Sequence, residues 1–470
     1  MAKAKKEGGA QAGKAKEAAP SGSASPGDRI RISCEGGQYT GILLPRAGPA
    51  GYITLKLPSG YNIGIKESRI SSIAVLEPSA ASIISQKSVT GKTAGAGKSR
   101  GAGAPLSVAS PRSATPPFIS ILGSGGTIVN RIDYRTGAVY PATSPDELLA
   151  GIPTASKYSL RAKILFSLAS EDISPAHWQA MAKETQQQIE DGAEGVILTH
   201  GTDTMHYTSA ALSFMLQHIP CPIILTGSQR SSDRGSSDAE SNMRGSLIAA
   251  KADLSGVFIC MHRDLSDDVC ALNFGTKVRK MHTTRRDAFR SINVHPAAIV
   301  HLAQEKVEKL SPACPSRNPS AKLSADTSLN TNVAMQYIYP GIKPHAISAL
   351  SKYDGVVLVG MGLGHLPVNL NGDPLAVPIL KEVKELVVSG IPVVFASQCI
   401  YGRAAMDVYT NSRAVKEAGV MGNMCDMTPE TAYVKLMWVL GHEKKMEKVK
   451  EQMEANIAGE ISDRSEITQY

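Results

Sequence analysis

Residues 195–227 read GVILTHGTDTMHYTSAALSFMLQHIPCPIILTG, and this stretch decides the fold class. It begins with an apolar run at 195–200, continues as a helix-like segment at 204–219, and ends in a second apolar run at 222–227. Short runs that are apolar throughout and alternate with helices are typical of parallel strands covered on both faces. The stretch therefore predicts a strand–helix–strand unit of an α/β protein.

The same alternation continues on both sides of this unit and falls into two blocks. The further strand-like and helix-like segments occupy residues 118–126, 176–192, 240–252, 256–261, 355–362, 377–390, 391–397 and 429–443. A polar stretch rich in Pro and Ser near 303–331 separates the blocks and reads as a linker or surface insertion. We therefore expect two α/β domains with parallel sheets, at residues 117–310 and 331–470.

A different pattern precedes these domains. Residues 28–78 hold five short runs of alternating apolar and polar residues separated by turn residues, which predicts a small β-barrel. No catalytic constellation lies in it, so we expect a docking domain. Residues 1–27 predict a disordered basic tail, and residues 79–116, rich in Ala, Gly, Ser and Lys, predict a flexible linker.

The excess positive charge lies in these two polar segments. The chain of 470 residues has a net charge of +8, of which residues 1–27 carry +3 and residues 79–117 carry +5. Charge on a flexible segment keeps it solvated and attracts RNA only weakly and in a salt-dependent way. The charge therefore does not predict a dedicated nucleic-acid-binding surface.

The cysteines and the apolar runs indicate the compartment. Seven cysteines, an odd number without CxxC spacing, favour buried thiols in a reducing cytoplasm over a metal site or a disulfide framework. No run approaches ~18 apolar residues, and none follows the basic N-terminal residues. We therefore expect a cytoplasmic protein without a transmembrane helix, a secretory signal or a metal site.

Polar clusters follow four of the predicted strands. They are Gly123–Thr127, Ser170–Asp172, His200–Thr204 and Thr226–Arg230. Ligands of open parallel sheets bind at the carboxyl ends of the strands, so these clusters predict the site. The first cluster lacks the Lys of a P-loop, and the predicted strands and the turns that follow them carry no GxGxxG, GxSxG or HExxH motif. Nucleotide, serine-hydrolase and zinc-protease chemistry are therefore disfavoured.

Chemistry based on threonine, aspartate and lysine remains. Thr127 lies on a Gly-rich turn, and a second Thr is followed by Asp at 202–203. A threonine hydroxyl becomes a nucleophile only when a base removes its proton. A desolvated lysine positioned by a carboxylate can be that base. Residues 277–280 offer Lys277, Arg279 and Lys280, and spacing alone does not choose among them.

The motifs GSGGTI, LASED, HGTDTM and TGSQR occur in this order and near the spacings of the bacterial-type L-asparaginases. Together with IPVVFASQCIYGRAAMDVY and PETAYVKLMWVLG, they make residues 117–445 resemble that family. Within it, the N-terminal barrel, segment 133–139 and the Ser-Glu-Asp triplet resemble the glutaminase subunits, called GatD, of archaeal glutamyl-tRNA(Gln) amidotransferases. The resemblance implies a two-domain asparaginase-like α/β fold preceded by the small β-barrel.

The resemblance also implies roles for individual residues. The catalytic residues that it implies are Thr127, Tyr134, Thr202, Asp203 and Lys280. The residues that it implies for substrate binding are Ser170 and Glu171, which resemble the pair that holds the α-carboxylate and α-ammonium groups. Lys280 is preferred because Lys-x-His followed by Asp-Ala-Phe is the local pattern of the family. Backbone N–H groups near Gly126 and Gly201 are expected to stabilise the oxyanion.

The implied reaction is hydrolysis of glutamine through a threonine acyl-enzyme, with either Thr127 or Thr202 attacking first. The implied partner is the E-type amidotransferase subunit, which binds the mischarged tRNA(Gln) and activates its glutamate with ATP and Mg, whereas this chain needs no cofactor. A heterotetramer with that partner and a homodimer through the asparaginase-like domains are expected. The alternative is a free-standing L-asparaginase/glutaminase with an accessory N-terminal domain.

Overall fold

The computed structural model divides the chain into two compact units, which are considered separately. The first holds the strands between Arg29 and Glu77 together with Ile132–Val139, and the second holds the α/β part of the chain. The residues that the structure describes are 24–35, 37–44, 51–57, 62–78, 117–126, 128, 131–132, 139–140, 144–150, 155–230 and 236–464. The expected linker at 79–116 and most of the expected tail at 1–27 lie outside these residues, so those boundaries stay predictions.

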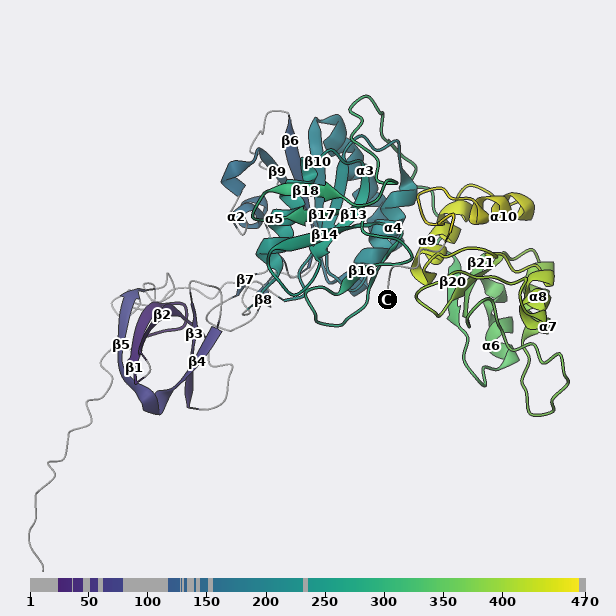
Figure 1. Cartoon of the computed structure of the whole chain (residues 1–470), viewed down its shortest axis with the longest axis horizontal. Coiled ribbons are helices and arrows are strands. Elements are labelled where there is room, and N and C mark those ends of the chain that lie inside the picture. The colour runs from purple at the N-terminus through teal and green to yellow at the C-terminus, as the bar shows by residue number, and fades with distance from the viewer. Residues whose placement is uncertain are drawn as a thin grey trace, which may run out of the picture. The chain divides into compact units, whose positions relative to one another are not determined.

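The first unit contains the five strands that the sequence predicts. They are β1 (Arg29–Cys34), β2 (Gly37–Leu43), β3 (Tyr52–Lys56), β4 (Asn62–Lys66) and β5 (Ile70–Glu77). They pair antiparallel in the order β4-β3-β2-β1-β5 (Figure 1). Ile30 and Ile32 of β1 are fully buried between exposed arginines, and they form a small core with Leu55 and Ile65. The period-two alternation is therefore confirmed.

The largest sheet of the second unit has eight strands. In sheet order they are β18 (Lys306–Lys309), β17 (Ala298–His301), β14 (Val269–Phe274), β13 (Gly256–His262), β12 (Pro222–Thr226), β10 (Ala193–Thr199), β6 (Phe118–Gly125) and β9 (Leu160–Leu168). The five strands from β13 to β9 are parallel, as expected, but β14, β17 and β18 are antiparallel. The six residues between His262 and Val269 are too few for a parallel crossover, so the chain reverses there.

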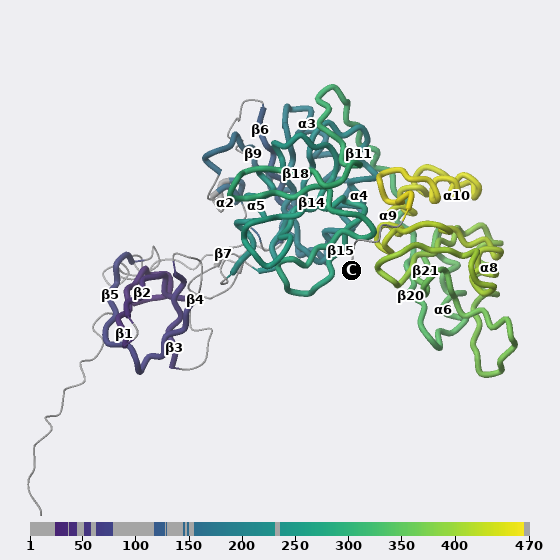
Figure 2. The backbone as a smooth tube through the Cα atoms, in the orientation of Figure 1, coloured from purple at the N-terminus to yellow at the C-terminus, as the bar shows by residue number. Residues whose placement is uncertain are grey.

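Helices cover both faces of this sheet (Figure 2). They are α2 (Pro145–Ala150), α3 (Pro175–Glu190), α4 (Met205–Met215) and α5 (Ala239–Ala250). Two short strand pairs belong to the same unit, β11 (Leu216–Gln217) with β19 (Ser324–Ala325) and β15 (Val278–Lys280) with β16 (Phe289–Ser291), and a third joins β7 (Arg131–Ile132) to β8 (Val139–Tyr140). The stretch near 303–331 is not a plain linker, because it supplies β18 and β19 and buries Cys314.

The second α/β block forms a three-stranded parallel sheet. Its strands are β20 (Val333–Tyr337), β21 (Gly355–Gly360) and β22 (Val393–Ser397), in that order. Its helices are α6 (Pro344–Ser348), α7 (Leu380–Val388), α8 (Thr410–Glu417), α9 (Pro429–Leu440) and α10 (Met446–Glu454). Helix α9 packs on β21 and on α4, where Trp438 stacks on Phe214 at 6.2 Å between ring centroids. One core therefore joins both sheets.

All seven cysteines lie among the described residues. All seven cysteines are free, and five of them are buried. Among the described residues, no helix is both long and apolar enough to cross a membrane.

Candidate active site

The four polar clusters lie at one edge of the eight-stranded sheet. The strands that precede them, β9, β6, β10 and β12, are consecutive in the sheet and parallel to one another. Their carboxyl ends therefore meet, and the loops that follow them are neighbours. The register pairs Gly123 of β6 with Thr199 of β10, and Thr199 in turn with Thr226 of β12.

Glycines allow these loops to touch. Gly126 has φ +86°, and a Cβ there would lie 2.7 Å from the backbone N of Gly201 and the carbonyl of His200. A Cβ on Gly201 would lie 2.7 Å from Cβ of Ser170. Because no real side chain fits at such distances, the loops after β6, β10 and β9 require glycine at 126 and 201. Gly126 therefore packs against the backbone of residues 200–201, and Gly201 packs against Ser170.

Lys280 joins this edge from the hairpin β15–β16. Its Nζ donates to Oγ1 of Thr202 at 2.8 Å and to Oδ1 of Asp203 at 2.9 Å. The Lys280 side chain is 10% exposed, whereas that of Asp203 is 70% exposed. A nearly buried ammonium thus lies between a hydroxyl and an accessible carboxylate. This is the geometry that a lysine needs to exchange a proton with threonine.

The other two candidates of the 277–280 segment point elsewhere. Lys277 pairs with Asp426 at 2.8 Å, and Arg279 pairs with Glu430 at 3.0 Å. Neither pair involves the strand-end loops. Of the three cationic residues between which spacing could not choose, Lys280 is the one beside Thr202.

Ser170 and Glu171 begin the 3₁₀ turn η5 (Ser170–Asp172) directly after β9. Ser170 is buried, and its Oγ lies 3.4 Å from Oε2 of Glu171, which is exposed. Oγ1 of Thr204 donates to the Ser170 carbonyl at 2.7 Å and ties the turn to the loop after β10. Ser170 therefore lies against the loop that carries Thr202, next to the exposed carboxylate of Glu171.

Two expected catalytic residues, Thr127 and Tyr134, lie outside the described residues. The turn before Thr127 is described: Oγ of Ser124 donates to the Thr199 carbonyl at 2.7 Å and is buried. The side chain at 124 therefore fixes the turn rather than facing the site.

The histidines near the site are held as structural groups. His200 is fully buried, and its Nδ1 donates to the Gly201 carbonyl at 2.6 Å while Nε2 meets Oγ1 of Thr208 at 2.8 Å. Burial lowers the pKa of His200 to about 4. Burial, assisted by Arg279, lowers the pKa of His206 to about 3. Both rings are neutral at pH 7, and His282 caps backbone N–H groups of an exposed loop.

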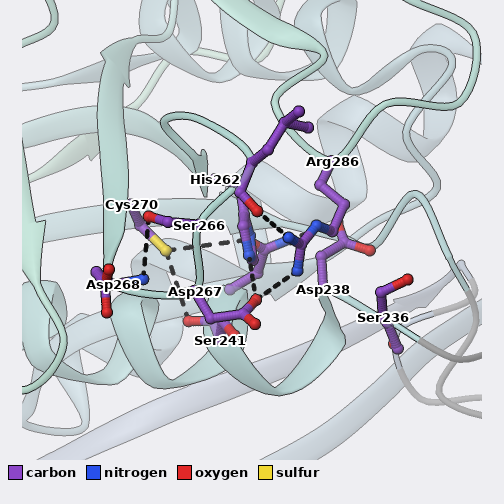
Figure 3. Close-up of polar contacts among 12 residues, drawn as sticks. Ser236, Asp238, Ser241, His262, Ser266, Asp267, Asp268, Cys270 and Arg286 are labelled. Atoms are coloured by element: carbon purple, nitrogen blue, oxygen red, sulfur yellow. Dashed lines mark hydrogen bonds and ion pairs between the residues drawn. The ribbon is translucent and has the colours of Figure 1, made fainter. Parts of the chain in front are cut away.

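A series of polar side chains supports the loop after β12, which carries the cluster Thr226–Arg230. Asp238, at the start of α5, accepts from the backbone N–H groups of Gln229 and Arg230 at 3.0 and 2.9 Å. Asn242 donates to Asp238 and to the Gly227 carbonyl, and it contacts Nδ1 of His262 at 2.7 Å. Figure 3 shows Asp267 between His262 and Arg286. Through Arg286, this series of polar contacts reaches the hairpin loop that follows Lys280. No motif in the sequence pointed to this support.

Metal chemistry has no candidate ligand set in the described part of the chain, where no group of three or more His, Cys, Asp or Glu side chains could hold an ion. The arrangement consists instead of hydroxyl, carboxylate and ammonium groups around closely packed backbone. It suits attack by a hydroxyl on an acyl carbon.

Three family models match successive parts of this chain. Residues 24–76 match the GatD N-terminal domain, residues 118–313 the N-terminal asparaginase domain, and residues 332–453 the glutaminase/asparaginase C-terminal domain. The GatD-type glutamyl-tRNA(Gln) amidotransferase subunit of Pyrococcus furiosus is 42% identical over 93% of this chain and 94% of its own. That of Methanothermobacter thermautotrophicus is 40% identical over 97% and 99%.

Solved asparaginases match a smaller part of the chain. The L-asparaginase of Thermococcus kodakarensis is 32% identical with a TM-score of 0.64, and L-asparaginase I of Vibrio cholerae is 27% identical with a TM-score of 0.63. Each covers 74% of this chain, although 99% and 100% of the asparaginases themselves are matched. The GatD relatives match nearly the whole chain, which disfavours the free-standing asparaginase. The chain belongs to the asparaginase family and, within it, to the GatD family of the glutamyl-tRNA(Gln) amidotransferases.

Proposed function

We propose that this chain hydrolyses glutamine at the edge formed by the strand-end loops and supplies the ammonia that converts Glu-tRNA(Gln) to Gln-tRNA(Gln). The observation that carries the proposal is the contact of Lys280 Nζ with Thr202 and Asp203. Family membership supports the overall reaction, and the lysine–threonine geometry supports the way in which it is carried out.

The reaction has two acyl-transfer steps. A threonine hydroxyl oxygen attacks the side-chain amide carbon of glutamine as its proton passes to a base. The amide C–N bond then breaks and ammonia leaves with a proton, which yields a glutamyl ester on the threonine. Water attacks this ester, and glutamate and the free hydroxyl result. For Thr202 the base is the neutral form of Lys280, and for Thr127 it is the phenolate form of Tyr134.

The neighbouring groups orient the substrate. Backbone N–H groups near Gly126 and Gly201 stabilise the oxyanion, because glycine allows close approach of the substrate. Ser170 and Glu171 hold the α-carboxylate and α-ammonium groups. Asp203 positions Lys280 and also faces the substrate ammonium, which fits a carboxylate that is mostly exposed.

The proposal extends to the assembly. The chain acts in the cytoplasm in a heterotetramer with the E-type partner, and it pairs with a second copy through the asparaginase-like domains. The E-type partner binds tRNA(Gln) and uses ATP and Mg to activate the glutamate, while this chain requires no cofactor. Ammonia then passes from the edge described above to the partner.

Single substitutions test the site. Thr127→Ala, Thr202→Ala, Asp203→Asn and Lys280→Ala should each reduce ammonia release from glutamine by about 10³-fold or more, and double variants should be hardly worse, since the groups act as a unit. Lys381→Ala, on an exposed helical lysine, is the matched control and should keep full activity. Near-normal turnover by Lys280→Ala in a folded protein would remove the base from the proposal.

The source of nitrogen gives a second test. With the partner subunit, charged tRNA and ATP, Thr127→Ala should lose product formation from glutamine but keep it from free ammonia, because glutamate activation belongs to the partner. Loss of both activities would instead assign Thr127 a structural role.

A further inference from the structure

The strand that carries Lys280 also carries charges on its opposite face. Side chains alternate along a strand, so Lys277 and Arg279 share one face of the β15 segment and Lys280 lies on the other. Lys280 reaches the loop after β10, whereas Lys277 and Arg279 reach Asp426 and Glu430 beside the second sheet. The short strand is thus held between the two sheets.

The first of these contacts is a fully buried ion pair. Nζ of Lys277 lies 2.8 Å from Oδ1 of Asp426, and the two side chains are 1% and 0% exposed. The carbonyl of Asp426 also accepts from Lys277 and, at 3.0 Å, from Nδ2 of Asn293, which follows β16. Burial lowers the pKa of Lys277 although a carboxylate lies beside it. Both arms of the hairpin are therefore fastened to one residue.

The second contact is made by Arg279, which lies two residues nearer to Lys280. Arg279 meets Glu430 at 3.0 Å, and the Glu430 side chain is 4% exposed in the first turn of α9. A carboxylate at a helix N-terminus interacts favourably with the helix dipole. Oγ1 of Thr431 also donates to the Thr276 carbonyl at 2.9 Å. Helix α9 is thereby hydrogen-bonded to the segment just before β15.

A buried ion pair contributes little net stability compared with packed apolar side chains of the same volume, but in some proteins it fixes the register of the elements that it joins. We infer that Asp426 and Glu430 are positioning residues that hold β15 so that Lys280 meets Thr202. The inference rests on the proposed role of Lys280. A displacement of a catalytic group by about 1 Å can cost about 10²-fold in rate.

The test is Glu430→Gln in the full-length chain, assayed alone and with its partner subunit for ammonia release from glutamine. The substitution keeps the shape of the side chain and removes its charge. We expect kcat to fall about 10- to 100-fold while KM changes by less than about 3-fold, because Ser170 and Glu171 lie on a different loop. Glu385→Gln, in an exposed helical pair, is the matched control and should leave both constants unchanged.

Arg279 supplies a second pair of variants that fold even if Glu430→Gln does not, because its side chain is partly exposed. Arg279→Met should lower kcat as Glu430→Gln does. The kcat of Arg279→Lys should be at least tenfold higher than that of Arg279→Met, since lysine keeps a cation at the contact. Unchanged kcat in folded Glu430→Gln and Arg279→Met, with Lys280→Met inactive, would overturn the positioning role alone. Full activity of Lys280→Met would instead overturn the proposed function.

Discussion

At the scale of single residues, the environment of each cation decides its role. Lys277 and Lys280 are three positions apart, yet one is paired with Asp426 and the other lies beside Thr202. The motifs placed Thr202, Asp203 and the strand-end glycines correctly at one edge, because strand ends of a parallel sheet must meet. Spacing alone did not choose between the lysines, because the partner of Lys277 is Asp426, far away in sequence. The choice of Lys280 came from the Lys-x-His pattern of the family.

His200 yields a prediction about pH. Its pKa is about 4 when folded and 6.5 in an ordinary environment, so the unfolded chain binds the proton more readily. The free energy of unfolding should therefore fall as the pH drops from 6.5 to about 4, by about 3 kcal/mol for this group. Urea unfolding midpoints at pH 7 and 4.5 should differ less in His200→Asn than in the wild type. His301→Asn, at a partly exposed site, is the control. Equal differences between the two midpoints in all three proteins would contradict the prediction.

At the scale of elements, α9 combines an apolar sequence with charges that are buried. Glu430 and Lys435 are 3% and 0% exposed in a helix that otherwise packs Leu436 and Val439 into the shared core. The apolar period predicted the helix, but the partners of the two charges lie on other elements and left no periodic signal. Charged residues on the apolar face of a helix were the only available hint, and they mark where α9 connects distant segments.

Lys435 should be costly to replace alone. Its Nζ lies 2.5 Å from Oε1 of Glu460, both side chains are fully buried, and Glu460 also accepts from the backbone N–H groups of Ile457 and Ala458. Lys435→Met leaves a buried carboxylate unpaired and should lower the free energy of unfolding by about 3–5 kcal/mol. Lys435→Met combined with Glu460→Gln should recover at least half of that loss in urea unfolding. Equal losses in the single and double variants would mean that packing, not charge, dominates.

At the scale of the whole molecule, the two compact units differ in what holds them together. The first has a core of four fully or nearly buried residues, whereas the second has cores that extend across both of its sheets. The change in composition near residue 117 predicts a boundary there, and this boundary stays a prediction. The antiparallel strands β14, β17 and β18 were missed. The short apolar runs of β14 and β17 do not show strand direction, and β18 reads Lys-Val-Glu-Lys, which is mostly exposed and gives no strand signal.

Removal of residues 1–116 should leave the α/β part folded, since its cores lie within residues 118–461. The truncated chain should keep its secondary structure and most of its intrinsic glutamine hydrolysis, but it should bind the partner subunit or support tRNA-dependent amidation less well. Sedimentation with the partner and ammonia release measure the two effects. Lost hydrolysis with unchanged assembly would show that the N-terminal unit supports the site instead of docking.

The pair Lys277–Asp426 also has a consequence in time. Its members are 149 residues apart, so a ribosome that adds about 5–20 residues per second makes Asp426 about 7–30 seconds after Lys277. During that interval the nascent chain has its threonine loops but lacks both anchors of the strand that carries the base. If β15 is positioned as inferred, glutamine hydrolysis begins only after the second sheet emerges, and unfinished chains release no ammonia.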